Sequence, residues 1–215
     1  AEWVWVLDDD CAPLPDCLKN LLKHKELSQC LNPVHKSVGG EIYGEEVWID
    51  AASCATVDFR DRSSKAGRPW WPRNTCSFEG MLIHRTIIEK IGFPDARFFV
   101  QHDDSLYGWL ANRHTQVIVV ADAIAQKLDC PRTQISIRKA GIYYPMRNLW
   151  IWKDYFDAAD PTLSDYRNRR IAWQFVYKAY QIIRYGKRAR ASQLRLLFYA
   201  WKHYRSKISG PMPGT

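Results

Sequence analysis

The hydrophobic pattern changes period from segment to segment, which predicts a mixed α/β fold. Trp3–Leu7 is a continuous apolar run of β-forming residues that ends at three acids. Such a run is typical of a strand buried on both faces, as in a parallel sheet covered by helices. The remaining pattern predicts strands over 77–84 and 116–120, helices over 15–25, 85–91, 103–113 and 140–157, a hairpin over 37–49 and a long polar loop over 58–74.

Two more helices are predicted in the tail, over 164–185 and 190–207. The second is amphipathic, because its large apolar residues recur at three- and four-residue spacing while most basic residues lie elsewhere. These apolar residues are Leu194, Leu197, Phe198 and Trp201. The tail has three interpretations: it packs on its own domain, it rests on anionic lipid headgroups, or it binds nucleic acid. The third ranks last, because no nucleic-acid motif accompanies the charge.

The formal net charge of +8 is concentrated at the C-terminal end. Residues 160–215 contain 12 Lys or Arg against 2 Asp or Glu, whereas residues 1–159 contain 19 basic and 21 acidic residues. A nearly neutral body therefore carries a basic tail. We expect a core domain over 1–158 and a basic helical extension over 159–215.

The composition is that of a globular protein, with 47% hydrophobic and 25% charged residues, and it excludes a disordered or fibrous chain. No apolar run approaches the roughly 18 residues of a membrane-spanning helix, and the start does not resemble a signal peptide. We therefore expect a cytoplasmic protein, peripheral at most at the inner face of a membrane. The 6 cysteines form no C-x-x-C pair and are expected to be reduced thiols, with disulfides as the lesser alternative.

Three consecutive acids, Asp8, Asp9 and Asp10, follow the first predicted strand. Side chains alternate along an extended chain, so Asp8 and Asp10 point to one side and Asp9 to the other. Two close carboxylates repel each other unless a cation neutralises them, and oxygen ligands suit Mg²⁺ or Mn²⁺. The alternative is a solvated acidic turn in which an Asp caps the next helix.

A second acidic cluster, His102-Asp103-Asp104, opens a predicted helix. Acids are favoured at helix N-termini, which is the structural explanation. The functional explanation is a general base that accepts a proton from a substrate hydroxyl. Trp70, Trp71 and Trp109 offer flat apolar faces on which sugar rings stack, although each could equally belong to the core.

In order and spacing, these segments resemble glycosyltransferase family 2 and, within it, the rhamnosyl- and galactofuranosyltransferase branch. The resemblance covers about residues 3–150. Its motifs are the Trp3–Leu18 segment with Asp8-Asp9-Asp10, Phe78-Glu79-Gly80-Met81-Leu82-Ile83, Ile91-Gly92-Phe93-Pro94-Asp95, Arg97-Phe98-Phe99, His102-Asp103-Asp104 and Tyr143-Tyr144 with Arg147-Asn148. The resemblance implies a partial GT-A fold, which is a Rossmann-like mixed sheet flanked by helices, with the helical extension following it.

The same resemblance implies roles for individual residues. Asp8 and Asp10 would hold the Mg²⁺ or Mn²⁺ that bridges the diphosphate of a UDP- or dTDP-sugar, with Asp9 beside them. Asp104 would deprotonate the acceptor hydroxyl, supported by Asp103. Gly80 would let the donor approach the backbone, and Lys127 would offer a positive charge to phosphate. The residues expected around the acceptor are Trp70, Trp71, His102, Trp109 and Arg147.

Two departures from the family pattern affect this interpretation. Members of the branch often carry a metal-binding His about two dozen residues after the base, and here the segment Ala123–Leu128 contains none. The roughly 80 to 100 residues that begin the family's fold and hold the nucleotide are not present before residue 3. We therefore expect strand 3–7 to have an unpaired edge through which the chain dimerises.

The expected function is an inverting, metal-dependent glycosyltransferase of bacterial polysaccharide biosynthesis. Its partners would be a nucleotide sugar and a glycan or lipid-linked acceptor, with membrane-surface contact through the basic tail and no nucleic acid. The alternative is a truncated or degenerate member of the family that has lost catalysis and serves as a scaffold or interaction module.

Overall fold

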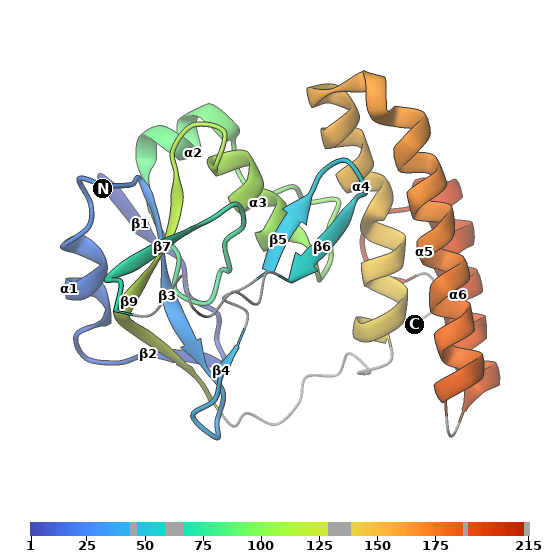
Figure 1. Ribbon diagram of the computed structural model, residues 1–215, viewed down its shortest axis with the longest axis horizontal. Coiled ribbons are helices and arrows are strands. Elements are labelled where there is room, and N and C mark those ends of the chain that lie inside the picture. The colour runs from blue at the N-terminus through green and yellow to red at the C-terminus, as the bar shows by residue number, and fades with distance from the viewer. Residues whose placement is uncertain (44–46, 59–66, 129–138, 187–188, 213–215) are drawn as a thin grey trace. The chain divides into compact units, whose positions relative to one another are not determined.

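A computed structural model of the chain describes residues 1–43, 47–58, 67–128, 139–186 and 189–212. It has the expected mixed α/β fold, with a curled mixed sheet flanked by helices (Figure 1). The chain forms two compact units. The sheet unit comprises residues 1–49, 56–94 and 104–131, and the helical unit comprises residues 50–55, 95–103 and 132–215. The predicted boundary after residue 158 stays a prediction.

The sheet has seven strands, in the order β1-β8-β3-β9-β2, with β4 added beside β3 and β7 beside β9. The strand bounds are β1 Trp3–Trp5, β2 Cys11–Pro13, β3 Cys30–Lys36, β4 Ile42–Tyr43, β7 Trp70–Arg73, β8 Leu82–His84 and β9 Val117–Lys127. Its two central strands, β3 and β9, are parallel, and the other pairs are antiparallel.

Strand β9 changes partners halfway along its length. Its register with β3 breaks after Pro33, which pairs with Val120, because the next residue of β3, Val34, pairs with Ile124. Residues 121–123 therefore form a bulge. Before the bulge β9 pairs with β7, and after it β9 pairs with β2. Bulges bend a strand and re-aim its side chains, and here the second half of β9 runs toward the end of β2.

Both faces of the central sheet are buried under helices. Neighbouring residues of each strand point to opposite sides, so every strand contributes side chains to both packed faces. Leu31, Leu82 and Ile118 pack against helix α1 (Cys17–Leu22) on one face. On the other face, the adjacent residues Cys30, Ile83 and Val117 pack against helices α2 (Arg85–Ile91) and α3 (Asp103–Ala111). The five cysteines of the described residues are free, as predicted, and all five are buried, while Cys130 lies outside the described residues.

The expectation that the first strand is buried on both faces is wrong for the described residues. Among the strands that the structure describes, β1 is an edge strand that pairs with β8 alone, in antiparallel orientation, and Val4 remains 39% exposed. The apolar run that begins at Trp3 is therefore half-buried. Trp3 and Trp5 pack inward, while Val4 points outward. Within the described part of the chain, the outer edge of β1 is unpaired, as expected.

The structure also differs from the predicted strand over 77–84 and the predicted loop over 58–74. The segment expected as a strand over 77–84 is strand only from Leu82 onward, because residues 78–80 form a turn. The expected polar loop over 58–74 contains β7, while its residues 59–66 lie outside the described part of the chain. A two-stranded sheet of β5 (Val47–Asp50) and β6 (Ala55–Asp58) was not predicted.

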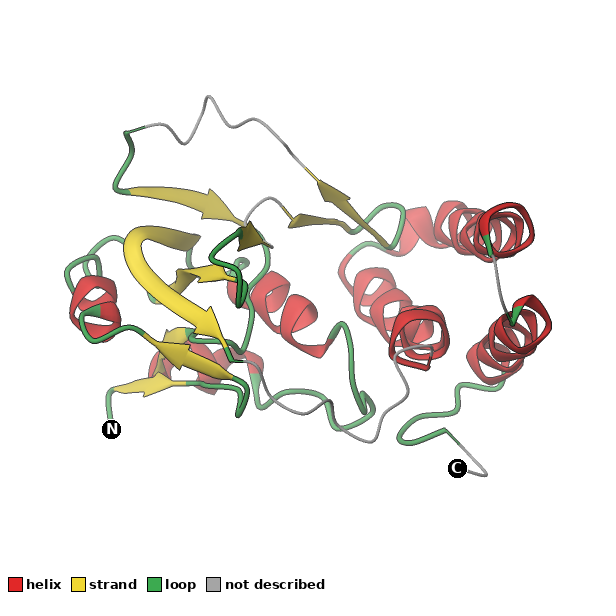
Figure 2. Cartoon of the chain, turned by 90° about the horizontal axis from the view of Figure 1, so that it is seen from below, coloured by secondary structure: helices red, strands yellow, loops and turns green. Residues whose placement is uncertain are grey.

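The helical unit is a bundle of three long helices, seen close to end-on in Figure 2. These are α4 (Tyr144–Ala159), α5 (Ser164–Tyr185) and α6 (Arg190–Arg205). A π-helical turn, η2 (Lys139–Tyr143), leads into α4, and a 3-10 turn, η3 (Pro161–Leu163), leads into α5. Among the described residues, no helix has both the length and the hydrophobicity needed to cross a membrane.

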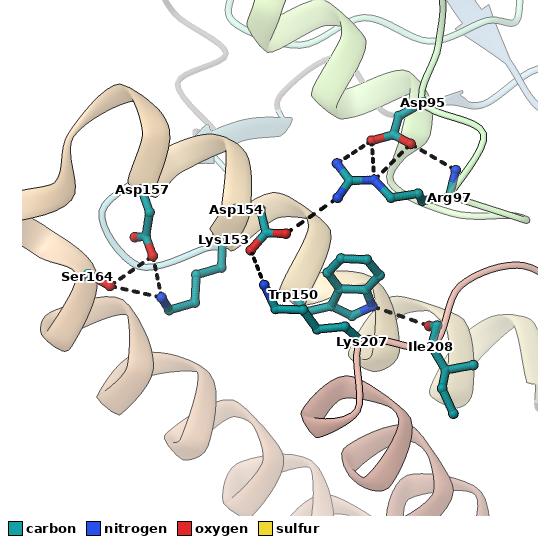
Figure 3. A network of polar contacts seen from close by, with 9 residues as sticks. All are labelled: Asp95, Arg97, Trp150, Lys153, Asp154, Asp157, Ser164, Lys207 and Ile208. Atoms are coloured by element: carbon teal, nitrogen blue, oxygen red, sulfur yellow. Dashed lines mark hydrogen bonds and ion pairs between the residues drawn. The ribbon is translucent and has the colours of Figure 1, made fainter.

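Ion pairs and hydrogen bonds tie this bundle together (Figure 3). Lys207, just after α6, pairs with Asp154 of α4 at 2.9 Å, and the Trp150 indole donates to the carbonyl of Ile208 at 3.3 Å. Asp157 of α4 accepts from Ser164, the first residue of α5, at 2.8 Å. Buried Arg167 joins Asp157 at 2.7 Å from the same side of α5. The tail is therefore packed on α4, and its polar contacts fix the three helices in one arrangement.

Candidate functional site

The turn over residues 78–80, together with Ser77 before it, lies beside the ends of β1 and β3 and is held through its backbone. The Asn32 side chain accepts from the amide of Ser77 at 3.0 Å, and His35 Nε2 contacts the carbonyl of Glu79 at 2.9 Å. Gly80 donates its amide to the carbonyl of Val6 at 3.0 Å, and its carbonyl accepts from the Trp5 indole at 3.0 Å. The turn is thereby fixed against the strand that leads into the acidic run.

Gly80 is required by the geometry of this turn. Its φ of +116° is a conformation that residues with a side chain rarely adopt, and an added Cβ would lie 2.7 Å from Pro33 Cγ. The family resemblance implies that Gly80 lets a donor sugar approach the backbone. The structure gives it a packing role against β3, and its donor-binding role stays a prediction.

Three carboxylates meet at this turn. One ligand oxygen from each of Asp8, Asp10 and Glu79 lies within 4.8 Å of the others. Asp8 and Asp10 come from the segment between β1 and β2, and the amide of Leu128 fixes this segment by donating to the carbonyl of Asp10 at 2.7 Å. Asp9 is an exposed turn residue. The carboxylates of Asp8 and Asp10 therefore lie together, although residues 9 and 10 form a turn and not the extended segment that the prediction assumed.

Lys127 brings a positive charge to the three carboxylates. Its ammonium lies 2.8 Å from Asp10 Oδ1 and also pairs with Glu79. Burial opposes the charged form of Lys127, but the hydrogen bonds to Asp10 and Glu79 outweigh it and raise its pKa, so it is an ammonium at neutral pH. Three carboxylates and one ammonium leave a net charge of −2, if all four are ionised.

Tyr43 and His35 complete the surroundings of Glu79. The Tyr43 hydroxyl donates to Glu79 Oε2 at 2.6 Å, and burial together with this hydrogen bond raises its pKa. Burial lowers the pKa of His35, so its ring is neutral at pH 7. Burial, and then the charge of Glu79, raises the pKa of the Cys11 thiol to about 11, so this thiol is not a nucleophile at neutral pH.

These residues fit a divalent cation. Carboxylate oxygens are the ligands that Mg²⁺ and Mn²⁺ prefer, and the site offers three of them from two separate segments. The local charge of −2 is the charge that one divalent ion neutralises. Lys127 is already among the same oxygens, so a bound ion and the ammonium would share Asp10 and Glu79.

The second acidic cluster lies at the start of α3. Asp104 Oδ1 accepts from the amide of Ser105 at 2.6 Å, and the Asp104 carbonyl accepts from the thiol of Cys76 at 3.2 Å. Cys76 lies three residues before Glu79, a stretch that spans about 11 Å at most. Gly108 makes this approach feasible, because a Cβ there would lie 2.0 Å from the backbone nitrogen of Cys76. Asp104 therefore belongs to the same compact unit as the three carboxylates.

The remaining predicted residues are dispersed, and their roles stay predictions. Trp71 is buried in β7, Trp70 packs on the α1 face of the sheet, and Trp109 of α3 lies under Arg113. Asp103 and His102 fall in the helical unit, where the His102 ring packs on Trp152 with centroids 4.4 Å apart. The fully buried Arg147 donates to the carbonyl of Gly210 at 2.8 Å, so it holds the chain after α6.

Sequence reasoning missed three residues of the site: Glu79, Tyr43 and His35. Glu79 stands directly before the glycine of the turn, and an isolated acid at that place was the available signal. Tyr43 and His35 pair across the β3–β4 hairpin, and no local pattern marks such a pair as close to residue 79.

No protein-family profile matches the chain, and no curated protein matches it. Solved structures do resemble it. GalNAc-T7 in complex with UDP, GalNAc and Mn²⁺ has a TM-score of 0.51 and 14% identity, covering 86% of this chain and 41% of that one. TarS 1-349 of S. aureus with UDP-GlcNAc has a TM-score of 0.49 and 14% identity, covering 97% and 58%. A197 from STIV has a TM-score of 0.37 and 18% identity, covering 58% and 56%.

GalNAc-T7 is a glycosyltransferase of the GT-A type, and at this identity the likeness shows the fold alone. The chain thus has a GT-A-like scaffold. It spans between 41% and 58% of the length of these neighbours.

Proposed function

We propose that the chain is part of an inverting glycosyltransferase of the family 2 type, similar to the rhamnosyl- and galactofuranosyltransferases. It would transfer a sugar from a UDP- or dTDP-sugar to a hydroxyl group of a glycan or a lipid-linked acceptor. The observation that carries the proposal is the group of Asp8, Asp10 and Glu79 at one end of a GT-A-like sheet, with Lys127 among them.

The chemistry requires stabilisation of a departing nucleoside diphosphate, which gains negative charge as its bond to the sugar breaks. Asp8, Asp10 and Glu79 would hold a Mg²⁺ or Mn²⁺ ion, which supplies positive charge to that diphosphate when bound. Lys127 would orient the same phosphates by its ammonium.

Asp104 would accept the proton of the acceptor hydroxyl. Attack from the side opposite the leaving diphosphate inverts the anomeric carbon. The short stretch from Cys76 to Glu79 and the contact between Cys76 and Asp104 support a base close to the donor site. Asp103 is the adjoining carboxylate in a supporting role.

The metal step is tested by isothermal titration of the chain with Mn²⁺ alone and then with UDP- and dTDP-sugars in its presence. We expect Mn²⁺ binding that Asp10→Asn weakens at least about tenfold. Asp16→Asn is the matched control, because Asp16 is an exposed carboxylate that pairs only on the surface, with Lys19. Unchanged binding in the Asp10 variant would remove the basis of the metal site.

The base assignment is tested separately, in a chain that includes any upstream sequence of the reading frame. Asp104→Asn is expected to lower the rate of sugar transfer at least about a hundredfold while leaving donor binding intact. Equal transfer by the Asp104 variant would show that another group accepts the proton.

A second candidate function is a catalytically inactive glycosyltransferase-like scaffold. Lys127 favours it, because its ammonium already neutralises part of the charge of Asp10 and Glu79 and could take the place of a metal ion. In that case the wild-type chain would not bind Mn²⁺, whereas Lys127→Met, which frees both carboxylates, would bind it.

A further inference from the structure

Helix α5 carries large apolar side chains on two opposite faces. The inner face, with Ile171, Phe175 and Ile182, is buried in the helical unit. The outer face exposes five large hydrophobic side chains, which follow one another at three-residue steps apart from the adjacent pair 176 and 177, and each of them is between 49% and 58% exposed. We call these residues the α5 stripe: Trp173, Val176, Tyr177, Tyr180 and Ile183.

The charges around the α5 stripe have one sign. Arg169 and Arg170 lie exposed one turn before it, and Arg184 lies exposed at its end. The only acid of α5 is Asp165, in the first turn of the helix. Helix α6 contains no acid at all, and its exposed Phe198 and Trp201 have basic neighbours.

An exposed aromatic stripe with basic flanks has the features of a helix that binds a membrane surface. Trp and Tyr have amphipathic rings that favour the headgroup level of a bilayer, where one end is apolar and the other is wet. An amphipathic helix with such a face and basic flanks lies in the plane of that interface. Anionic lipid headgroups attract basic residues that lie within about a Debye length of the membrane surface.

Charge complementarity favours a lipid surface over a second copy of the chain as the partner of the α5 stripe. Two α5 stripes packed antiparallel would bring Arg184 of each copy toward Arg169 and Arg170 of the other, and like charges would meet without an acid between them. An anionic surface meets the same arginines with opposite charge. The apolar side chains of the stripe leave water in either case, so the charges decide.

We propose that the α5 stripe binds the surface of an anionic lipid bilayer, with Trp173, Tyr177 and Tyr180 inserted at headgroup level and the flanking arginines paired with lipid phosphates. This inference goes beyond the proposed function, because it concerns where the chain acts and does not depend on the chemistry of the carboxylates.

The test is co-sedimentation of the full chain with sucrose-loaded vesicles of phosphatidylcholine, with and without 30% phosphatidylglycerol (about a third of the lipid, a charge density typical of anionic membranes). Wild type is expected to bind the anionic vesicles at least about tenfold more tightly. Trp173→Gln combined with Tyr180→Gln is expected to lower the partition coefficient at least about tenfold, because two interfacial rings are lost.

The control is Phe93→Gln, which removes an 87% exposed aromatic ring from the sheet unit and should leave the partition coefficient unchanged. Arg169→Gln combined with Arg170→Gln tests the charge term independently and should also lower binding to anionic vesicles about tenfold. Since all of these side chains are exposed, thermal unfolding by circular dichroism should match wild type.

Equal binding of wild type to neutral and anionic vesicles would overturn the proposal. So would binding that is unaffected by both double variants. A concentration-dependent dimer in sedimentation without lipid, abolished by the Trp173 and Tyr180 pair, would assign the stripe to a second copy instead.

Discussion

Glu79 connects the parts of the candidate site. Its carboxylate accepts from Tyr43 and pairs with Lys127, and its carbonyl is contacted by His35. Its ligand oxygen completes the group with Asp8 and Asp10. The two aspartates lie two residues apart in one acidic run and are easy to recognise, whereas Glu79 becomes significant only when β3, β4 and β9 are assembled. The site therefore depends on long-range structure as much as on the acidic run.

Removing the charge of Glu79 should weaken the binding of metal. Glu79→Gln replaces one anionic ligand and leaves Lys127 to pair with Asp10 alone, so the affinity for Mn²⁺ should fall at least about tenfold. Isothermal titration measures it. Glu89→Gln, an exposed acid of α2 paired with Arg85, is the control and should bind Mn²⁺ as wild type does.

His102 should make the stability of the protein depend on pH. Burial lowers its pKa from 6.5 to about 4, so the folded state keeps the ring neutral. As the pH falls below about 6.5 the unfolded chain binds a proton that the folded state refuses, so the free energy of unfolding decreases. Between pH 7 and pH 5 this one residue should account for about 2 kcal/mol, measured by urea unfolding.

The variant His102→Asn isolates that contribution. The φ of His102 is +74°, in the left-handed region, which Asn adopts more readily than most residues. The stability of the variant should vary less between pH 7 and pH 5 than that of wild type. If both proteins show the same pH dependence, His102 is not the group responsible.

Helix α3 packs unusually close to the backbone of a neighbouring segment. Gly108 rests against the backbone of Thr75 and Cys76, and the Asp104 carbonyl accepts from the thiol of Cys76, two residues before the turn of residues 78–80. A side chain at position 108 would therefore push α3 away from this segment.

Gly108→Ala should test this close approach. The new Cβ would lie 2.0 Å from the nitrogen of Cys76, so α3 must shift, and we expect a loss of about 1–3 kcal/mol in the free energy of unfolding. Urea unfolding followed by circular dichroism measures it. Gly141→Ala is the control, because nothing lies within 4 Å of the added atom. Similar stabilities for the two variants would contradict the close packing.

The sequence predicted helices better than strands, for a physical reason. Helices α2, α5 and α6 follow local periodicity and end at residues such as Gly92 and Gly186, so their expected and observed bounds agree closely. Strand β3 escaped prediction because Pro33 and His35 interrupt its apolar pattern, and the sheet buries them nonetheless. Strand β9 runs past its expected end at residue 120, because pairing with β2 and β3 continues across a bulge that no local signal marks.

The whole molecule combines a nearly neutral sheet unit with a basic helical unit. The edge of β1 belongs to the sheet unit and the α5 stripe to the helical unit, so the two expected contacts with other surfaces are separable by mutation. The unpaired edge presents free amide and carbonyl groups, which favour pairing with another chain.

Self-association through that edge is expected for the chain of residues 1–215. Sedimentation velocity at increasing concentration should show a dimer, and Val4→Lys should weaken it, because a charged side chain on an edge strand opposes pairing. Val4 is exposed, so the substitution should leave the fold intact. A wild-type monomer at high concentration would exclude this contact.

The bulge at residues 121–123 divides β9 into two halves that have different neighbours in the sheet. The first half, Val117–Val120, pairs with β7 and lies in the core, while the second half pairs with β2 and carries Lys127 to the carboxylates. Because the register with β3 shifts at the bulge, one continuous strand serves both the core of the sheet and the end of the sheet where the three carboxylates meet.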